Sequence, residues 1–165
     1  QWSVIAQHPY ITASYLWNMF DFAVPTSKRG SVDARNMKGM MTFDRKIKKD
    51  SYFWYKANWS KEPVLYMTQR RNVLRERKET SVTVYSNIGT PKVYLNDREL
   101  SGIRKGYTDV HYVFDKVLLN DGKNVLRAVV TWQGREYVDE MEWEYRGECN
   151  READFFEHKK EHGSW

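Results

Sequence analysis

Residues 110–130, VHYVFDKVLLNDGKNVLRAVV, decide most of the fold. Within them Val110, Tyr112 and Phe114 recur at every second position, which is the period of a β-strand with one buried face. The Asn-Asp-Gly sequence at 120–122 favours a tight turn, because these residue types tolerate a positive φ. A second apolar run follows that turn. The stretch therefore predicts two antiparallel strands joined by a short connection.

The same pattern continues on both sides of this pair, with a turn about every ten residues. It recurs at Val82 and Val84, at Val93 and Leu95 before the turn pair Asn96-Asp97, and through residues 137–145. Six or seven short strands between residues 61 and 147 predict an antiparallel β-sandwich of immunoglobulin-like type, although the Cys-Trp-Cys pattern of true immunoglobulin domains is absent. No polar cluster gathers around a pocket in this part, so its role is expected to be architectural.

Composition excludes several classes of protein. The chain has 165 residues, of which 41% are hydrophobic, so it can bury a substantial core. It contains no apolar run long enough to span a membrane, and its single cysteine, Cys149, excludes an internal disulfide framework. Because the chain opens on Gln1 with no signal-peptide pattern, we expect it to be a piece of a longer protein.

A basic cluster raises the question of nucleic-acid binding, because the sequence pI is about 9.2. Its five cations are Arg70, Arg71, Arg75, Arg77 and Lys78, and Glu76 and Glu79 are interleaved with them. The acidic neighbours favour a solvated strand face and loop over a phosphate-binding surface. We therefore expect neither a nucleic-acid nor a membrane partner.

Residues 1–60 have a different character and are expected to form a separate unit from residues 61–147 and from a tail at 148–165. Residues 2–6 fit a helix that ends before His8-Pro9. The apolar run 11–22 is typical of a strand inside a parallel α/β sheet, and Asp50 is a plausible N-cap for a helix from 51 to about 58. One or two such strands cannot cover both faces of a parallel sheet, so this unit requires neighbours outside the chain.

Four motifs in this first unit carry a resemblance to a known family. They are YLWNMFDF at 15–22, NMKG at 36–39, TFDRK at 42–46 and KANW at 56–59. Together they resemble the last strand and last helix of the catalytic (β/α)8 barrel in glycoside hydrolase family 2, the family of β-galactosidases and β-glucuronidases. Residues 61–147 are similar to the immunoglobulin-like domain that follows the barrel in many bacterial members. The resemblance thus implies a mixed fold class, in which the C-terminal end of a (β/α)8 barrel is followed by an antiparallel sandwich.

The resemblance also implies an activity for the parent protein. Such enzymes are retaining glycosidases with two catalytic Glu about 5–5.5 Å apart. Both lie on earlier barrel strands, and residues 1–60 contain no Glu, so no catalytic residue is assigned and the chain alone is expected to be inactive. No cofactor or metal is implied. The family resemblance points to a bacterial periplasmic or extracellular location, and homo-oligomer formation stays open.

Three residues match substrate contacts of the family. Trp17 corresponds to a tryptophan that forms an apolar wall of the sugar subsite, with a core tryptophan at the barrel rim as the alternative. Asn36 and Lys38 correspond to the N-x-K triplet that grips the substrate carboxylate in β-glucuronidases. That triplet also occurs in β-galactosidase-like members, so it does not settle the sugar. The flanking motifs favour a β-galactoside as the substrate, and a uronide, either a glucuronide or a galacturonide, is the alternative.

Two alternatives remain at this point. The sandwich could be a carbohydrate-binding or purely structural module, and exposure of the aromatic residues Tyr107, Trp132 and Tyr137 would favour carbohydrate binding. In the tail, His158 and His162 have the i, i+4 spacing of a short helix and could share a metal. No third ligand with a matching spacing follows, so they are interpreted as exposed polar positions.

Overall fold

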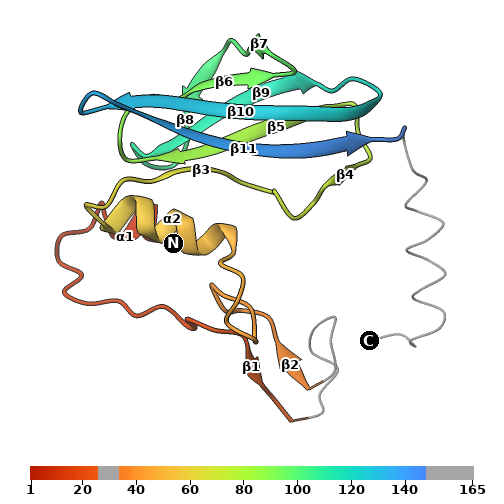
Figure 1. The fold of residues 1–165 in the computed structure, drawn as a ribbon. Coiled ribbons are helices and arrows are strands. Elements are labelled where there is room, and N and C mark those ends of the chain that lie inside the picture. Colours follow the sequence, from red (N-terminus) through yellow and green to blue (C-terminus); the bar gives the residue numbers. More distant parts are fainter. Residues whose placement is uncertain (26–33, 148–165) are drawn as a thin grey trace.

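Alternating apolar residues in the second part of the chain form two packed β-sheets (Figure 1). The computed structural model describes residues 1–25 and 34–147, so the predicted tail helix with His158 and His162 lies outside the described residues. One sheet has the strand order β4-β11-β10-β6-β7 and the other the order β3-β5-β9-β8. The strands are β3 (Leu65–Met67), β4 (Leu74–Arg75), β5 (Glu79–Ser86), β6 (Lys92–Leu95), β7 (Arg98–Glu99), β8 (Ile103–Lys105), β9 (His111–Leu118), β10 (Gly122–Trp132) and β11 (Arg135–Tyr145).

The core lies between these sheets and follows the predicted alternation. In β10 the side chains of Leu126, Ala128 and Val130 are buried. On the neighbouring strand β11, Met141 pairs with Leu126, and Trp143 pairs with the buried Asn124. The largest fully buried side chain is Trp143. The remaining core residues are Met67, Val82, Val84, Val93, Leu95, Tyr112, Phe114, Val117, Leu119 and Tyr145. The prediction of a β-sandwich is therefore confirmed.

The predicted turns also form where their residue types allow. Asn96 and Asp97 have φ values of +48° and +65°, the left-handed conformation that a two-residue hairpin turn requires. At the start of β10, Gly122 has a φ of +83°. Asn124 is fully buried just beyond it, and its side chain bonds to the backbone of Asn120 and Gly122. The Asn-Asp-Gly turn is thus fixed from inside the sandwich.

Helix α2 (Asp50–Trp59) lies against β3 and β5 of the sandwich, as Figure 1 shows. Its cap differs from the prediction, because Lys49 is the N-cap and Asp50 is the first helical residue. The Asp50 carboxylate instead accepts a hydrogen bond from the Tyr66 hydroxyl at 2.7 Å and another from the Gln69 backbone N–H at 2.8 Å. Burial, together with this bond to Asp50, raises the pKa of Tyr66. Donors on the sandwich thus use the carboxylate that was expected to cap the helix.

Aromatic side chains form most of the contact between α2 and the sandwich. The rings of Phe53 and Tyr66 stack with their centroids 3.8 Å apart. Trp54 packs edge-on against both Tyr85 and His111, with centroids 5.2 Å from each. Burial raises the pKa of the Tyr85 hydroxyl to about 12. Helix and sandwich are therefore joined by a second, aromatic core beneath the first.

The N-terminal unit is mostly irregular, and one prediction for it is wrong. Helix α1 (Trp2–Ile5) ends before His8-Pro9 as expected, but the run 11–22 forms no continuous strand. Only β1 (Phe22–Ala23) is regular there, and it pairs with β2 (Arg35–Asn36). A strand needs hydrogen-bonding partners along its length, and the described residues supply them to this run only from Asn18 onward. Neither described helix has the length and apolar character needed to cross a bilayer.

Two members of the basic cluster serve the fold. Arg70 donates to both carboxylate oxygens of Asp139 on β11, at 2.5 and 2.8 Å. The guanidinium of Arg75 lies 4.2 Å above the ring of Trp143 and donates to Gln69 and Thr80. The interpretation of the cluster as a solvated face is therefore wrong for these two side chains, which are partly buried because they pair with groups of the sandwich.

His111 gives the stability of the α2 contact a predicted pH dependence. Its ring is buried beside Trp54 and Tyr85, and its Nδ1 accepts a hydrogen bond from the Tyr107 backbone N–H at 3.0 Å. Burial, with a smaller contribution from the charge of Arg104, lowers the pKa of His111. The unfolded chain therefore binds a proton here more readily than the folded chain does, and the free energy of unfolding should fall as pH drops below about 6.5.

Urea unfolding of the wild type and of His111→Phe between pH 8 and pH 5 measures this effect. The wild type should lose more stability over the range than the variant does, because the variant has no group to protonate at this site. Equal slopes for the two proteins would contradict the prediction.

Candidate functional site

The structure gathers the three predicted sugar contacts around the short β1–β2 sheet. The ring of Trp17 packs edge-on against Phe22, with centroids 5.8 Å apart, and Phe22 is paired across the sheet with Asn36. Lys38 follows two residues beyond Asn36 on the same loop. Trp17 is 75% exposed, and the Lys38 side chain is exposed as well. Trp17 and Asn36 are thus both neighbours of Phe22, although they lie 19 positions apart in the sequence, and Lys38 lies on the loop that follows Asn36.

The loop that carries Lys38 is organised by its own side chains. The Asn36 Oδ1 accepts a hydrogen bond from the Lys38 backbone N–H at 3.0 Å, which fixes the turn between them. Among the described residues no carboxylate pairs with the Lys38 ammonium. The loop therefore has an ordered backbone and a charged side chain that is available to a ligand.

A buried ion pair behind this loop was missed in the sequence. Asp21 is 7% exposed, and its Oδ1 accepts hydrogen bonds from the Gly39 N–H at 2.9 Å and from the Lys49 ammonium at 2.6 Å. The same ammonium donates to the Met37 carbonyl at 3.0 Å. The one available signal was a carboxylate inside the apolar run WNMFDF, since a buried acid requires a partner.

A steric constraint explains why the last residue of the NMKG motif is glycine. A Cβ added at Gly39 would lie 2.1 Å from the backbone nitrogen of Asp21 and 2.1 Å from the carbonyl carbon of Phe20. These are backbone atoms that cannot move aside, so any larger residue would push the loop away from β1. The loop carrying Lys38 thus approaches the segment after Trp17 as closely as backbones allow.

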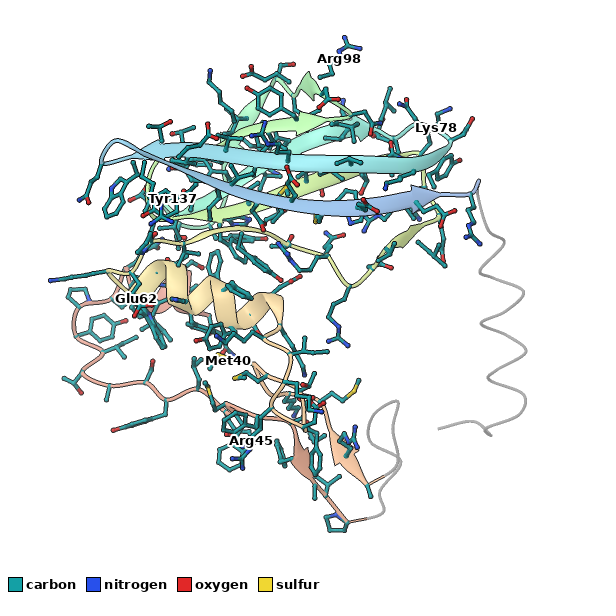
Figure 2. The ribbon with its side chains drawn as sticks, viewed as in Figure 1. Met40, Arg45, Glu62, Lys78, Arg98 and Tyr137 are labelled. Atoms are coloured by element: carbon teal, nitrogen blue, oxygen red, sulfur yellow. The ribbon has the colours of Figure 1, made fainter. Side chains whose placement is uncertain are left out.

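The TFDRK motif forms the turn beneath the loop. The Thr42 hydroxyl donates to Asp44 at 2.5 Å and accepts from the Ile47 N–H, and the bond from Thr42 is the main reason why the pKa of Asp44 is lowered. Arg45 has a φ of +62°, and its guanidinium lies 4.6 Å above the ring of Phe20. Figure 2 shows Met40 just below α2 and Arg45 further from the sandwich. The motif therefore supports the loop and β1 from one side.

The remaining surface of the N-terminal unit is unusually apolar. A groove of about 360 Å³ lies between the loop and α2, lined in part by Met19, Met40 and Trp59. Exposed large side chains on this unit are Val4, Tyr10, Ile11, Tyr15, Trp17, Met19, Met37, Phe43, Ile47 and Trp59. An apolar surface of this extent is typical of an interface with further protein.

The three aromatic residues of the sandwich belong to two separate contacts. Tyr107 is 76% exposed and packs on His111 at 5.6 Å. Trp132 and Tyr137 are half-buried against each other at the β10–β11 turn, with centroids 6.1 Å apart, and Arg135 covers Tyr137. These contacts do not test whether the sandwich binds carbohydrate. That alternative therefore stays a prediction.

The known proteins that this chain resembles are named as β-glucuronidases or β-galactosidases. No family model matches the chain. It is 35% identical over 147 residues to a curated β-glucuronidase of Bacteroides fragilis, a match that covers 88% of this chain and 21% of that protein. A crystal structure of a Bacteroides fragilis protein provisionally named a β-galactosidase is 75% identical with a TM-score of 0.90, covering 93% of this chain and 23% of that one.

A third relative is the FMN-binding β-glucuronidase of Faecalibacterium prausnitzii L2-6. Its crystal structure is 37% identical with a TM-score of 0.73, covering 87% of this chain and 22% of that one. The chain thus spans about a fifth of the length of the relatives that it matches. The resemblance to β-galactosidases and β-glucuronidases is confirmed, and the chain is a homologue of one segment of this group of glycosidases.

Proposed function

We propose that this chain is the C-terminal portion of a retaining glycoside hydrolase of family 2. Residues 1–60 would complete the catalytic (β/α)8 barrel, residues 61–147 would form the accessory sandwich, and residues 148–165 the tail. The exposed apolar surface of the N-terminal unit supports this, because barrel strands and helices from the rest of the parent would cover it. The two catalytic Glu would come from that missing part.

In this proposal Trp17, Asn36 and Lys38 line one side of the sugar subsite. Three observations support it: Trp17 packs on Phe22, Phe22 pairs across the sheet with Asn36, and the exposed Lys38 lies on the ordered loop that follows Asn36. An indole face suits the C–H face of a pyranose ring, since it provides contact area without requiring hydrogen bonds. The amide and the ammonium suit the polar substituents at the edge of the same ring.

The Lys38 ammonium favours a uronide as the substrate. It has no carboxylate partner among the described residues, and a sugar carboxylate would supply one. The names of the β-glucuronidase relatives point the same way. A β-galactoside is the second candidate, supported by the flanking WNMFDFA and TFDRK motifs and by the name of the 75% identical relative.

We expect hydrolysis only when the rest of the parent protein is present. The 165-residue chain should release no 4-nitrophenol from 4-nitrophenyl β-D-glucuronide or β-D-galactoside, because it would lack both the proton donor and the nucleophile. The full-length protein should cleave at least one of the two substrates with retention of anomeric configuration. Turnover by the purified chain above a blank preparation would contradict the assignment, and so would inversion by the full-length protein.

A further inference from the structure

The loop carrying Lys38 is held by one carboxylate and one ammonium. The Oδ1 atom of Asp21 accepts hydrogen bonds from the Gly39 N–H and from the Lys49 ammonium. The same ammonium donates to the Met37 carbonyl. The Lys49 backbone N–H donates to the Met40 carbonyl at 2.9 Å. Peptide groups on both sides of Lys38 are therefore bonded to two residues that lie 28 positions apart in the sequence.

This arrangement also fixes the loop relative to Trp17. The Asn18 carbonyl, in the residue after Trp17, accepts a hydrogen bond from the Met40 N–H at 3.0 Å. Asp21 is three residues further along the same segment. The segment that carries Trp17 and the loop that carries Lys38 thus share one set of bonds, and the Asp21–Lys49 pair lies at its centre.

We propose that Asp21 and Lys49 are positioning residues, which hold the Lys38 ammonium at a set distance from Trp17 so that it meets the acidic substituent of the sugar; this inference rests on the proposed function. Neither residue touches the substrate. The side chains of Asp21 and Lys49 are only 5% and 20% exposed, so their pairing is weakly screened by solvent. A binding group that is held in place before the substrate arrives loses little freedom on binding, which lowers KM.

Lys49→Met in the full-length protein is the first test, because methionine keeps the length of the stem and removes the charge. On 4-nitrophenyl β-D-glucuronide we expect KM to rise roughly tenfold with kcat changed by less than about threefold, since a binding group is misplaced rather than a reacting one. Lys49→Arg should restore part of the loss because arginine can pair with Asp21. Lys92→Met, at an exposed lysine of the sandwich, is the matched control and should match the wild type.

The decisive measurement is the double variant Lys38→Met with Lys49→Met. If Lys49 acts through Lys38, its replacement should raise KM no further once Lys38 is gone. An equal loss from Lys49→Met in both backgrounds would overturn the proposal, because it would show a purely structural role. A large effect of Lys38→Met with none from Lys49→Met would overturn the positioning role alone. No effect of Lys38→Met on either sugar would overturn the substrate assignment as well.

Hydrogen exchange in the 165-residue chain provides a second measurement that does not depend on activity. The Gly39 amide is bonded to Asp21, so Lys49→Met should speed its exchange while amides of the sandwich strands keep their protection. Unchanged protection of the Gly39 amide would overturn the proposal, even if the full-length variant cannot be purified.

Discussion

Lys38→Ala in the full-length protein should lower kcat/KM on an aryl β-glucuronide by roughly thirty- to a thousandfold and leave an aryl β-galactoside almost unaffected. The ammonium would bind the sugar carboxylate where water is largely excluded, and losing such a charge-assisted hydrogen bond costs on the order of 2–4 kcal/mol in transition-state binding. A galactoside offers only a neutral hydroxyl at that position. The ratio of the two effects therefore reports the class of substrate.

Trp17→Ala in the same protein is the companion variant. It should reduce kcat/KM severely on both sugars, because the indole would form a wall of the subsite whatever the substituent at the ring edge. The measurement is kcat/KM of the wild type and both variants on paired glucuronide and galactoside substrates. A mild effect of Trp17→Ala on both would mean that this tryptophan packs against the parent barrel and that it does not contact the sugar.

Trp143→Ala should destabilise the sandwich by about 3–5 kcal/mol, the range for deleting a large buried aromatic side chain. Trp143 is 1% exposed at the centre of the core, its ring lies beneath the guanidinium of Arg75, and its Nε1 donates to the Gln69 carbonyl at 3.4 Å. The substitution would leave a cavity and remove both contacts. Because domains are typically stable by only about 5–15 kcal/mol, much of this stability would be lost.

Urea unfolding of the 165-residue chain, followed by circular dichroism, tests this value. Trp132→Ala is the control, since that ring is half-buried at a turn and contacts Tyr137 rather than the core. It should cost less than about 1 kcal/mol. Similar losses for the two variants would mean that the core does not depend on Trp143 as the packing indicates.

The sandwich could be predicted because its signals are local. Alternation and turn residues such as Asn96-Asp97 act over a few positions, and burial between two sheets reinforces them. The N-terminal unit was harder, because a strand at 11–22 requires pairing partners along its whole length, and the described residues provide them only from Asn18 onward. The cap role expected of Asp50 failed for a related reason, since Tyr66 and Gln69 compete for its carboxylate.

For the candidate site, the sequence identified the residues expected to contact the sugar, but it did not identify the residues that hold them in place. Trp17, Asn36 and Lys38 stood out through motifs, whereas the Asp21–Lys49 pair joins positions 28 residues apart and has no local signature. The need for glycine at position 39 likewise follows from the approach of another backbone segment. Such features depend on tertiary distances, which short-range patterns do not encode.

The attachment of α2 to the sandwich has a consequence for protein engineering. The helix begins directly after Lys49 and is joined to the sandwich by the Asp50–Tyr66 bond and the Phe53–Tyr66 stack. A chimaera of two relatives spliced between residues 60 and 61 would mix unmatched partners across this contact. A splice before Lys49 would keep the helix with its own sandwich but separate Lys49 from Asp21. Because α2 also contacts Gln69, Tyr85 and His111, recombination in this group should succeed most often when residues 17–147 are inherited as one block.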